Sequence, residues 1–236
     1  MFQELNADHL SLIWRGAVVT VQICLLSVLF GGIGGTVIGL MSTGPVKLLR
    51  WIAAIYVALI RGIPVLLIIF FVYFGLPLLN PGSSLPEYWA AVIALSVFAA
   101  AYIAELVRGS IQAVPRGQFE AAQALGMSYA QQMRWVVVPQ AARIIIPPGV
   151  GFLVVLIKDS SLVAVIGLVE LTRAGNVVSS LTADPILTYL IVGLFYFVIC
   201  FALSTAARWY EQRLGVHAAP PEITDALALT TGAKSQ

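Results

Sequence analysis

Charged side chains are scarce in this sequence, and their scarcity excludes a soluble domain. Asp, Glu, Lys and Arg make up 10% of the 236 residues, against about 25% in soluble proteins, while hydrophobic residues make up 60%. This composition indicates an integral membrane protein. The net charge of +2 comes from basic residues that are spread over the loops, so the sequence does not predict nucleic-acid binding.

Residues suited to catalysis or metal binding are equally few. The two histidines, His9 and His217, lie near the two ends, and Cys24 and Cys200 lie inside apolar runs, where a thiol behaves as a small hydrophobe. The sequence contains no G-x-x-x-x-G-K-[ST] loop for a nucleotide phosphate. We therefore predict no catalytic residue, no metal site and no cofactor bound by this chain. A membrane-embedded enzyme would need a converging acid, base or metal set, which the sequence lacks.

Long apolar runs account for most of the chain. A spanning helix needs ~20 mostly apolar residues, which leaves room for about five or six spans and no separate soluble domain. We predict an all-α integral membrane protein with about five transmembrane helices, at residues 12–41, 51–76, 88–107, 144–169 and 186–207. The expected organisation is an external segment at 1–11, a transmembrane domain at 12–210 and a flexible cytoplasmic tail at 211–236. The first ten residues lack Lys and Arg, which argues against a cleaved signal peptide.

The first span carries a stripe of glycines. Gly31, Gly35 and Gly39 repeat at four-residue spacing, and Gly32 and Gly34 lie between them. Glycines at this spacing expose a bare helix face against which another helix can pack closely. We predict a packing face here.

Ionisable residues inside the second and third spans require an explanation. Arg61 lies roughly ten positions, or ~15 Å, into the second span, and Pro64 then kinks or divides that helix. A charge at this depth must snorkel, pair or face an aqueous cavity. At the end of the third span, Glu105 and Arg108 have the i,i+3 spacing of an ion pair that anchors the helix end.

The fourth span is interrupted by Lys158-Asp159-Ser160-Ser161. Only fourteen apolar or small residues precede this quartet, which is ~21 Å of helix, short of the ~30 Å hydrocarbon core. The quartet is therefore expected inside the membrane, beyond its middle. Transporters bind substrates where such a helix is interrupted, so one interpretation is a ligand or ion pathway. In the other, Lys158 and Asp159 neutralise each other or Arg61 as a structural pair.

The segment 114–139 is too polar to cross a bilayer, although apolar sequence flanks it on both sides. It predicts a short helix from Gln118 to Leu125, with Glu120 in the first turn, and Gly126 ends that helix. Ser128 has the capping-box spacing to a glutamine three residues later, which predicts a second short helix from Tyr129 to Pro139.

This two-helix segment resembles the cytoplasmic coupling loop of ABC importer permeases. Glu120-Ala121-Ala122, Gly126 after three further residues, and Val136-Val137-Val138-Pro139 keep the spacing of that family's motif, with valines for the usual Ile and Leu. In the family this loop docks into a groove on a separate ATPase subunit. The resemblance implies that ATPase coupling depends on Gln118, Glu120, Ala121, Ala122, Gly126 and Pro139.

Two further patterns are similar to the polar amino-acid branch of that family. They are Arg61-Gly62-x-Pro64 and Lys158-x-x-Ser161-Leu162, and the resemblance covers about residues 16–210. It implies a second permease subunit, identical or related, an ATPase dimer that holds ATP and Mg²⁺, and an external amino-acid-binding protein. A zwitterionic substrate needs cationic and anionic or dipolar partners, and the candidate substrate-path residues are Arg61, Lys158, Asp159, Ser160 and Ser161.

Charge alone predicts the orientation of the chain. If five spans alternate in direction, most cationic side chains gather on the side that carries the coupling loop, namely Lys47, Arg50, Arg108, Arg116, Arg134, Arg208 and Arg213. By the positive-inside rule the N-terminus is outside and the C-terminus inside. The predicted location is a bacterial inner membrane, crossed several times. The rival hypothesis, an ion-coupled transporter or channel, usually involves an internal repeat, and the sequence shows none.

Overall fold

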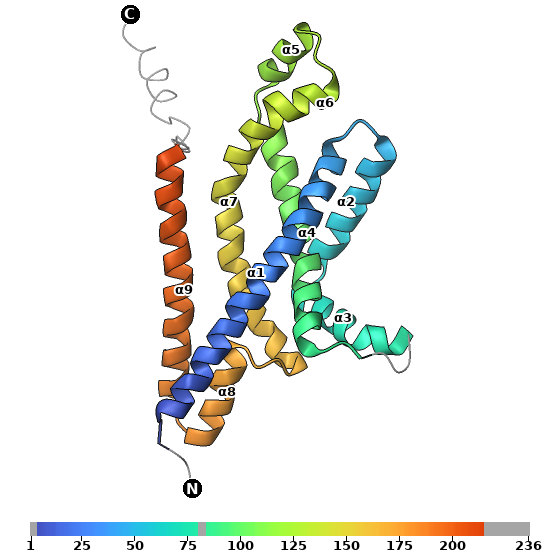
Figure 1. Ribbon diagram of the computed structural model, residues 1–236. Helices are drawn as coiled ribbons and strands as arrows, with labels where there is room; N and C mark the ends of the chain where they lie inside the picture. Colours follow the sequence, from blue (N-terminus) through green and yellow to red (C-terminus); the bar gives the residue numbers. More distant parts are fainter. Residues whose placement is uncertain (1–3, 80–83, 215–236) are drawn as a thin grey trace, which may run out of the picture.

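The computed structural model describes residues 4–79 and 84–214, and every element in these ranges is helical (Figure 1). A π-helical turn, Met133–Val137, joins α6 to α7, and a 3₁₀ helix, Ser160–Ile166, extends α7. The predicted all-α class is confirmed. The α-helices are α1 Ala7–Thr43, α2 Lys47–Gly62, α3 Val65–Leu79, α4 Glu87–Gln112, α5 Arg116–Ala124, α6 Tyr129–Gln132, α7 Val138–Asp159, α8 Leu171–Thr182 and α9 Pro185–Leu214.

Four continuous helices in the described ranges are long and apolar enough to cross a membrane. They are Ala7–Thr43, Glu87–Gln112, Tyr129–Ile166 and Pro185–Tyr210. The pair α2 and α3 passes the same test jointly but is bent by 101°. The protein therefore has four candidate spans, or five if the bent pair counts as one, in agreement with the predicted number.

The break between α2 and α3 falls at Ile63-Pro64, where the sequence predicted it. Ile63 has extended backbone angles, as the residue before a proline prefers, and Pro64 has no N–H to continue the helix. The end of α3 differs from the prediction, because the helix continues through Pro77 to Leu79 instead of ending at Leu76. Residues 80–83, which follow α3, lie outside the described residues.

Helices α1 and α4 pack closely through the predicted glycines. A Cβ atom on Gly31 would lie 2.7 Å from the Cβ of Ala99, and one on Gly39 would lie 2.6 Å from the Cβ of Val107. Gly35 faces the carbonyl oxygen of Ala100, 2.7 Å from the place of its missing Cβ. The packing face is thus confirmed for the four-residue repeat.

A single apolar cluster lies where α1, α3, α4 and α7 meet. Its fully buried members include Ile23 of α1, Ile69 of α3, Leu95 of α4 and Leu156 of α7. The central position of α4 follows from its run of small residues, because alanines allow three neighbouring helices to approach its axis. This cluster therefore holds in place the helices that bear the polar residues of the candidate site.

Helix α8 is a short amphipathic helix that connects the 3₁₀ helix to α9. Glu170 caps it, accepting hydrogen bonds from the backbone N–H groups of Thr172 (2.9 Å) and Arg173 (2.8 Å). The Glu170 side chain is fully buried and also accepts from the hydroxyls of Thr20 in α1 (3.3 Å) and Tyr196 in α9 (3.1 Å). One carboxyl group therefore ties three helices together.

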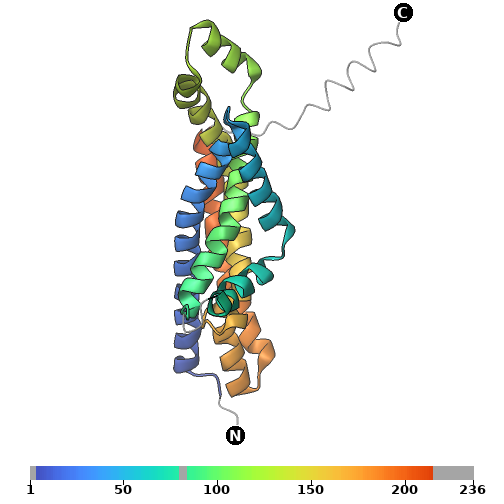
Figure 2. The same cartoon turned by 90° about the vertical axis from the view of Figure 1, so that its right-hand side faces the viewer.

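The two ends of the bundle differ. Helices α5 and α6 extend beyond the end at which α1 finishes and α2 begins, whereas α8 and the N-terminus lie at the other end (Figures 1 and 2). Helix α9 continues to Leu214, so the predicted flexible tail 211–236 starts as helix. Residues 1–3 of the predicted external segment and 215–236 of the tail lie outside the described residues.

Candidate functional site

Helix α5 begins two residues earlier than predicted. It runs from Arg116 to Ala124, with Pro115 at its N-cap and no side-chain capping bond. Glu120 therefore lies in the second turn, exposed, and the expectation that it occupies the first turn is wrong. The rigid backbone angle of Pro115 starts the helix without a polar cap.

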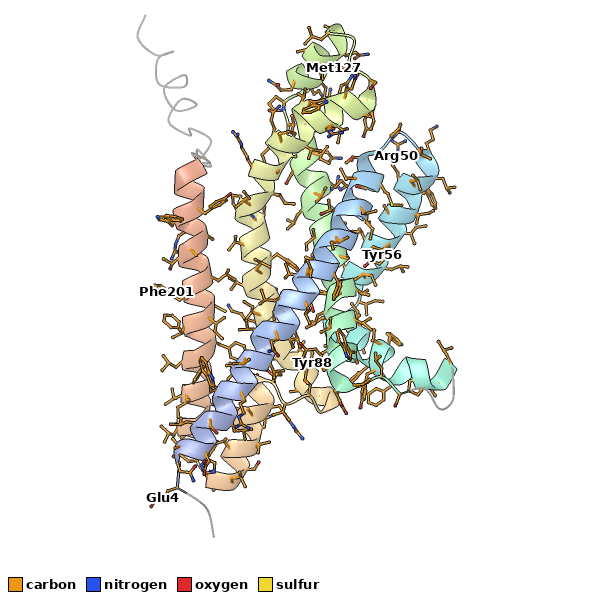
Figure 3. The ribbon with its side chains drawn as sticks, in the orientation of Figure 1. Glu4, Arg50, Tyr56, Tyr88, Met127 and Phe201 are labelled. Atoms are coloured by element: carbon orange, nitrogen blue, oxygen red, sulfur yellow. The ribbon has the colours of Figure 1, made fainter. Side chains whose placement is uncertain are left out.

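Gly126 ends α5 as predicted, and it does so through a Schellman motif. Its φ of +73° lies in the left-handed region, which favours glycine. The N–H of Gly126 donates to the carbonyl of Gln123 (2.9 Å), and the N–H of Met127 donates to the carbonyl of Ala122 (3.2 Å). The chain reverses here, and Met127 lies at the far tip of the loop (Figure 3).

The start of α6 is confirmed, but its predicted end is not. Ser128 and Gln131 form both bonds of the capping box. The helix does not stop at Pro139: it passes through the π-helical turn into α7, and Pro139 lies in the first turn of α7. The π turn, in which the Val138 N–H donates to the carbonyl of Met133, shifts the hydrogen-bond register just before the residue that has no N–H.

The loop has a buried base and an exposed apolar outer side. Ala122 is buried at the base, and a small cluster nearby joins Met133 and Val137 to the end of α4. Leu125 and Trp135 are 80% and 66% exposed. Such apolar side chains on a segment too polar to enter the bilayer are available for contact with another protein.

Two side-chain bonds hold this loop against the bundle. The hydroxyl of Tyr129 donates to the carbonyl of Thr43, the last residue of α1, at 3.1 Å. The side-chain amide of Gln140 in α7 donates to the Gln118 oxygen (3.3 Å). Gln118 is thus the predicted coupling residue with a side-chain contact to a spanning helix, while Glu120 and Ala121 face outward.

The polar quartet lies at the end of α7 that is remote from the loop. The chain stays helical there and only tightens into the 3₁₀ turn, which ends at Gly167 with φ of +95°. Ser160 is buried and its hydroxyl donates to the carbonyl of Ile157, while that of Ser161 donates to the carbonyl of Lys158, each at 2.7 Å. Lys158 is exposed and Asp159 is half-buried.

Arg61 makes its contacts with α4 and not with the quartet. Its Nη1 atom lies 3.9 Å from Oε1 of Glu105, and its guanidinium carbon lies 5.0 Å from the centre of the Tyr102 ring. The predicted pair of Glu105 with Arg108 is confirmed, with Nε donating to Oε2 at 2.9 Å. Arg61 and Arg108 both pair with Glu105, and among the side chains that the structure describes Lys158 and Asp159 are not paired with each other or with Arg61.

An aromatic stack connects Arg61 to α7. The rings of Tyr102 and Phe152 are stacked with their centres 5.2 Å apart, on the side of Tyr102's helix that meets α7. Phe152 and Asp159 are seven residues apart and therefore share one face of α7, ~10 Å apart along its axis. The stack places Arg61 near the side of the bundle on which Asp159 lies.

Sequence reasoning missed the roles of Glu170 and Tyr102. Each was treated as part of a helix or connector, because the partners of Glu170 lie 150 and 26 positions away in the sequence and no local pattern joins them. A glutamate at the start of an amphipathic segment is nevertheless a sign of a helix start, because carboxylates are favoured near helix N-termini.

Charges inside the spans of a helical membrane protein, together with a two-helix loop beyond the bundle, are the features of a permease, and this is the class to which the fold and the site point. Residues 35–216 match the model of the family described as "Binding-protein-dependent transport system inner membrane component". The chain belongs to this family. It is the inner-membrane permease component of such a system and not its ATPase, as the resemblance to ABC importer permeases predicted.

Named relatives support this assignment over nearly the whole chain. The probable glutamine ABC transporter permease protein GlnP of Bacillus subtilis is 36% identical, over 88% of this chain and 96% of its own length. The arginine transport system permease protein ArtQ of the same species is 37% identical, over 86% and 92%. A solved structure of an amino acid ABC transporter with histidines has 34% identity and a TM-score of 0.83, and covers 89% of this chain and all of that one.

Proposed function

We propose that this chain is the permease subunit of an ABC importer that takes up polar amino acids. The observation that carries the proposal is the combination of relatives named for glutamine and arginine, each at least 36% identical, with a Lys158 and an Asp159 in one span that have no ion-pair partner among the described residues. An amino acid presents both charges to its carrier, so a path with separate cationic and anionic groups suits it.

The proposed complex contains two permease subunits, an ATPase dimer that binds ATP and Mg²⁺, and an external amino-acid-binding protein. The family description, which specifies dependence on a binding protein, supports the last of these. The exposed Leu125 and Trp135 support a protein partner at the coupling loop. The sequence contains no P-loop motif, so ATP is assigned to the partner in this proposal.

The proposed orientation places the coupling loop and the C-terminus in the cytoplasm and the N-terminus outside. Basic side chains support it, because Lys47, Arg50, Arg116 and Arg134 belong to the loop end of the bundle or its flank. Asp8 and Asp184 belong to the other end.

In the proposed mechanism, closure of the ATPase pair on ATP draws the coupling loops together. The Schellman turn at Gly126 and the Ser128 cap hold the two loop helices in a fixed arrangement. The continuous helix from Tyr129 to Ile166 then transmits the movement to the quartet. A rigid lever suits this role because packed helices shift as units. Tilting of this helix would open the central cavity outward.

Within the path, Arg61 and Lys158 are the proposed partners of the substrate carboxylate, and Asp159 the partner of its amino group. Ser161 donates its hydroxyl hydrogen to a backbone carbonyl, which leaves its oxygen lone pairs as acceptors for an ammonium group, whereas Ser160 is fully buried in this structure. We expect Asp159→Asn and Ser161→Ala to weaken the uptake affinity. Normal affinity in both variants would contradict this assignment.

The test of the complex is copurification from the native membrane in mild detergent. Tagged wild type should carry a near-stoichiometric ATPase, and Gly126→Asp should lose it, because aspartate disturbs the left-handed turn and adds charge at the docking surface. Gln123→Asp, which adds the same charge at an exposed position of α5, is the matched control. A wild-type sample without an ATPase would favour ion-gradient transport instead.

A further inference from the structure

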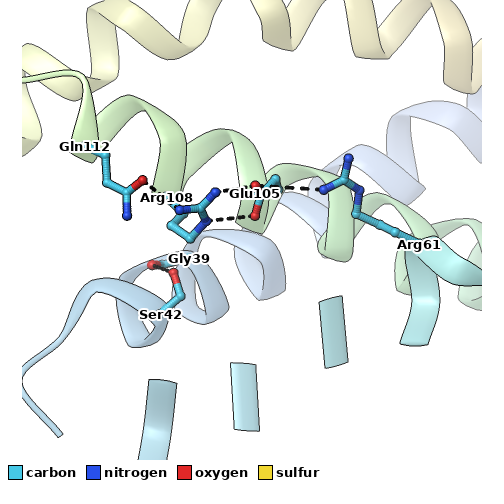
Figure 4. A network of polar contacts seen from close by, with 6 residues as sticks. All are labelled: Gly39, Ser42, Arg61, Glu105, Arg108 and Gln112. Atoms are coloured by element: carbon cyan, nitrogen blue, oxygen red, sulfur yellow. Dashed lines mark hydrogen bonds and ion pairs between the residues drawn. The ribbon is translucent and has the colours of Figure 1, made fainter. Parts of the chain in front are cut away.

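Glu105 lies between two guanidinium groups that hold it unequally (Figure 4). Arg108 holds both carboxylate oxygens, with Nε donating to Oε2 at 2.9 Å and Nη2 donating to Oε1. Arg61 shares only Oε1, from 3.9 Å, without a hydrogen bond. Bidentate pairing is the stronger arrangement, so Arg108 is the firm partner of Glu105 and Arg61 is the loose one.

The cluster of Arg61, Glu105 and Arg108 carries one positive charge in excess. Its remaining polar contact, the Gln112 oxygen that accepts from Arg108 at 2.7 Å, is neutral. The side chains of Arg61 and Glu105 are 41% and 31% exposed, so neither is enclosed by the rest of this chain. Charges inside membrane spans are normally compensated, and one further anion would compensate this cluster.

Arg61 is the member with free donor capacity. Among the residues that the structure describes, its guanidinium makes the loose pair with Glu105 and lies over the ring of Tyr102, but no hydrogen bond from it is recorded. Tyr102 stacks on Phe152, which shares a face of α7 with Asp159. An anion arriving on this side would meet Arg61 before Arg108.

We propose that Glu105 occupies Arg61 in place of the substrate's carboxylate when no substrate is bound, and that the two carboxylates exchange on Arg61 during transport. The inference rests on the proposed function, in which Arg61 belongs to the amino-acid path. When substrate arrives, the loose pair opens while Glu105 stays on Arg108, so neither state leaves an unpaired carboxylate. Glu105 thus sets the affinity by competition, and Arg108 sets how strongly Glu105 competes.

Competition predicts opposite effects for the two partners of one ion pair. Glu105→Gln removes the competitor and should tighten substrate binding, whereas Arg108→Gln frees Glu105 to pair fully with Arg61 and should weaken it. We expect a change of roughly threefold in each direction, the scale of a partly exposed ion pair. A Glu105–Arg108 pair that only anchors α4 would give two changes of the same sign.

The measurement is equilibrium binding of radiolabelled L-arginine or L-glutamine to the purified permease–ATPase complex, without the binding protein. Glu105→Asp, which keeps the charge, should retain the wild-type dissociation constant. In the Arg61→Gln background, Glu105→Gln should have no effect. L-Argininamide, which lacks the carboxylate, should compete equally well in wild type and Glu105→Gln.

The outcomes separate the two proposals. Complexes with unchanged melting temperature whose dissociation constants shift in the same direction, or not at all, would overturn the exchange while leaving amino-acid transport in place. If Glu105→Gln fails to assemble, Glu105→Ala, which also removes the carboxylate, should likewise tighten binding. If Arg108→Gln fails to assemble, Arg108→Lys, which cannot pair with both carboxylate oxygens, should weaken binding by a smaller amount. A wild-type complex that binds no amino acid of any kind would instead overturn the proposed function.

Discussion

Three glycines set the distance between α1 and α4. The missing Cβ atoms of Gly31, Gly35 and Gly39 would each fall within 2.8 Å of atoms in α4, closer than real Cβ contacts come. In lipid there is no hydrophobic drive between helices, so this close backbone approach supplies the attraction through van der Waals contact. Single glycine residues therefore determine how closely α1 and α4 pack.

Enlarging one of these glycines should destabilise the protein, while enlarging a neighbour should not. We expect Gly35→Val to lower the free energy of unfolding by about 1–3 kcal/mol, the usual cost of overpacking. Gly32 meets no atom within 4 Å of an added Cβ, so Gly32→Val is the matched control and should cost little. Thermal unfolding in detergent measures both. Equal losses would show that general glycine replacement, and not the contact with α4, is responsible.

Glu170 should make stability depend on pH. Burial raises the pKa of this carboxyl above its ordinary value, against hydrogen bonds from Thr172, Arg173, Tyr196 and Thr20 that lower it. A group whose pKa is higher in the folded state binds more protons there. Its stabilising contribution is therefore complete below the ordinary glutamate pKa and is lost as pH rises through the raised value.

We expect Glu170→Gln to flatten that dependence. The amide keeps an oxygen acceptor for the cap of α8 and cannot ionise, so the melting temperature of the variant should gain on that of wild type as pH rises from ~4 towards neutrality. Melting curves at a series of pH values test this. Parallel curves for the two proteins would mean that Glu170 is equally charged in the folded and unfolded states.

At the scale of elements, the coupling loop separates residues that fold it from residues that it presents outward. Leu125 is 80% exposed and contacts no core, so Leu125→Asp should change the free energy of unfolding by less than about 0.5 kcal/mol. The same change should lower ATPase recovery in copurification at least about tenfold if Leu125 fills a groove on the partner, as buried apolar anchors do at interfaces. Full recovery of the ATPase would exclude Leu125 from the docking surface.

Local signals in the sequence were sufficient for some elements and not for others. The capping box of Ser128, the glycine end of α5 and the break at Pro64 were predictable because each depends on neighbouring residues. The continuation of the helix through Pro139 was not, because a π turn earlier in the chain adjusts the hydrogen-bond register. The start of α5 was predicted two residues too late, because a proline can begin a helix as well as end one, and Pro115 begins this one.

The candidate path was predictable in part. The positions of Arg61 and the quartet within apolar runs predicted charges inside the spans. The partners of these charges depend on how separate helices are rotated against one another, and that rotation is set by packing and not by any local sequence pattern. Glu105 therefore appeared to be a local partner of Arg108, although it also faces Arg61 across the contact between α2 and α4. The buried link from Glu170 to Thr20 was beyond reach for the same reason.

At the scale of the whole molecule, the helices fall into a tight group and a looser flank. α1, α3, α4 and α7 share the main cluster, whereas α9 exposes apolar side chains along its length, among them Leu190, Leu194, Phe197 and Phe201. Phe201 on α9 and Arg50 on α2 mark opposite sides of the bundle (Figure 3). Exposed apolar surface of this extent suits lipid or a second permease subunit.

The orientation of this bundle can be tested with single cysteines. Ala124 at the end of α5 and Ser180 on α8 are both exposed and lie at opposite ends of the bundle, outside the spanning helices. With Cys24 and Cys200 replaced by serine, we expect Ser180→Cys to react with a membrane-impermeant maleimide in intact cells whose outer barrier has been opened. Ala124→Cys should react only after the inner membrane is broken or inverted, because the positive-inside rule places the loop in the cytoplasm. The reverse pattern would place the coupling loop outside, where no ATP-driven partner could reach it, and the proposed mechanism would fall with the orientation.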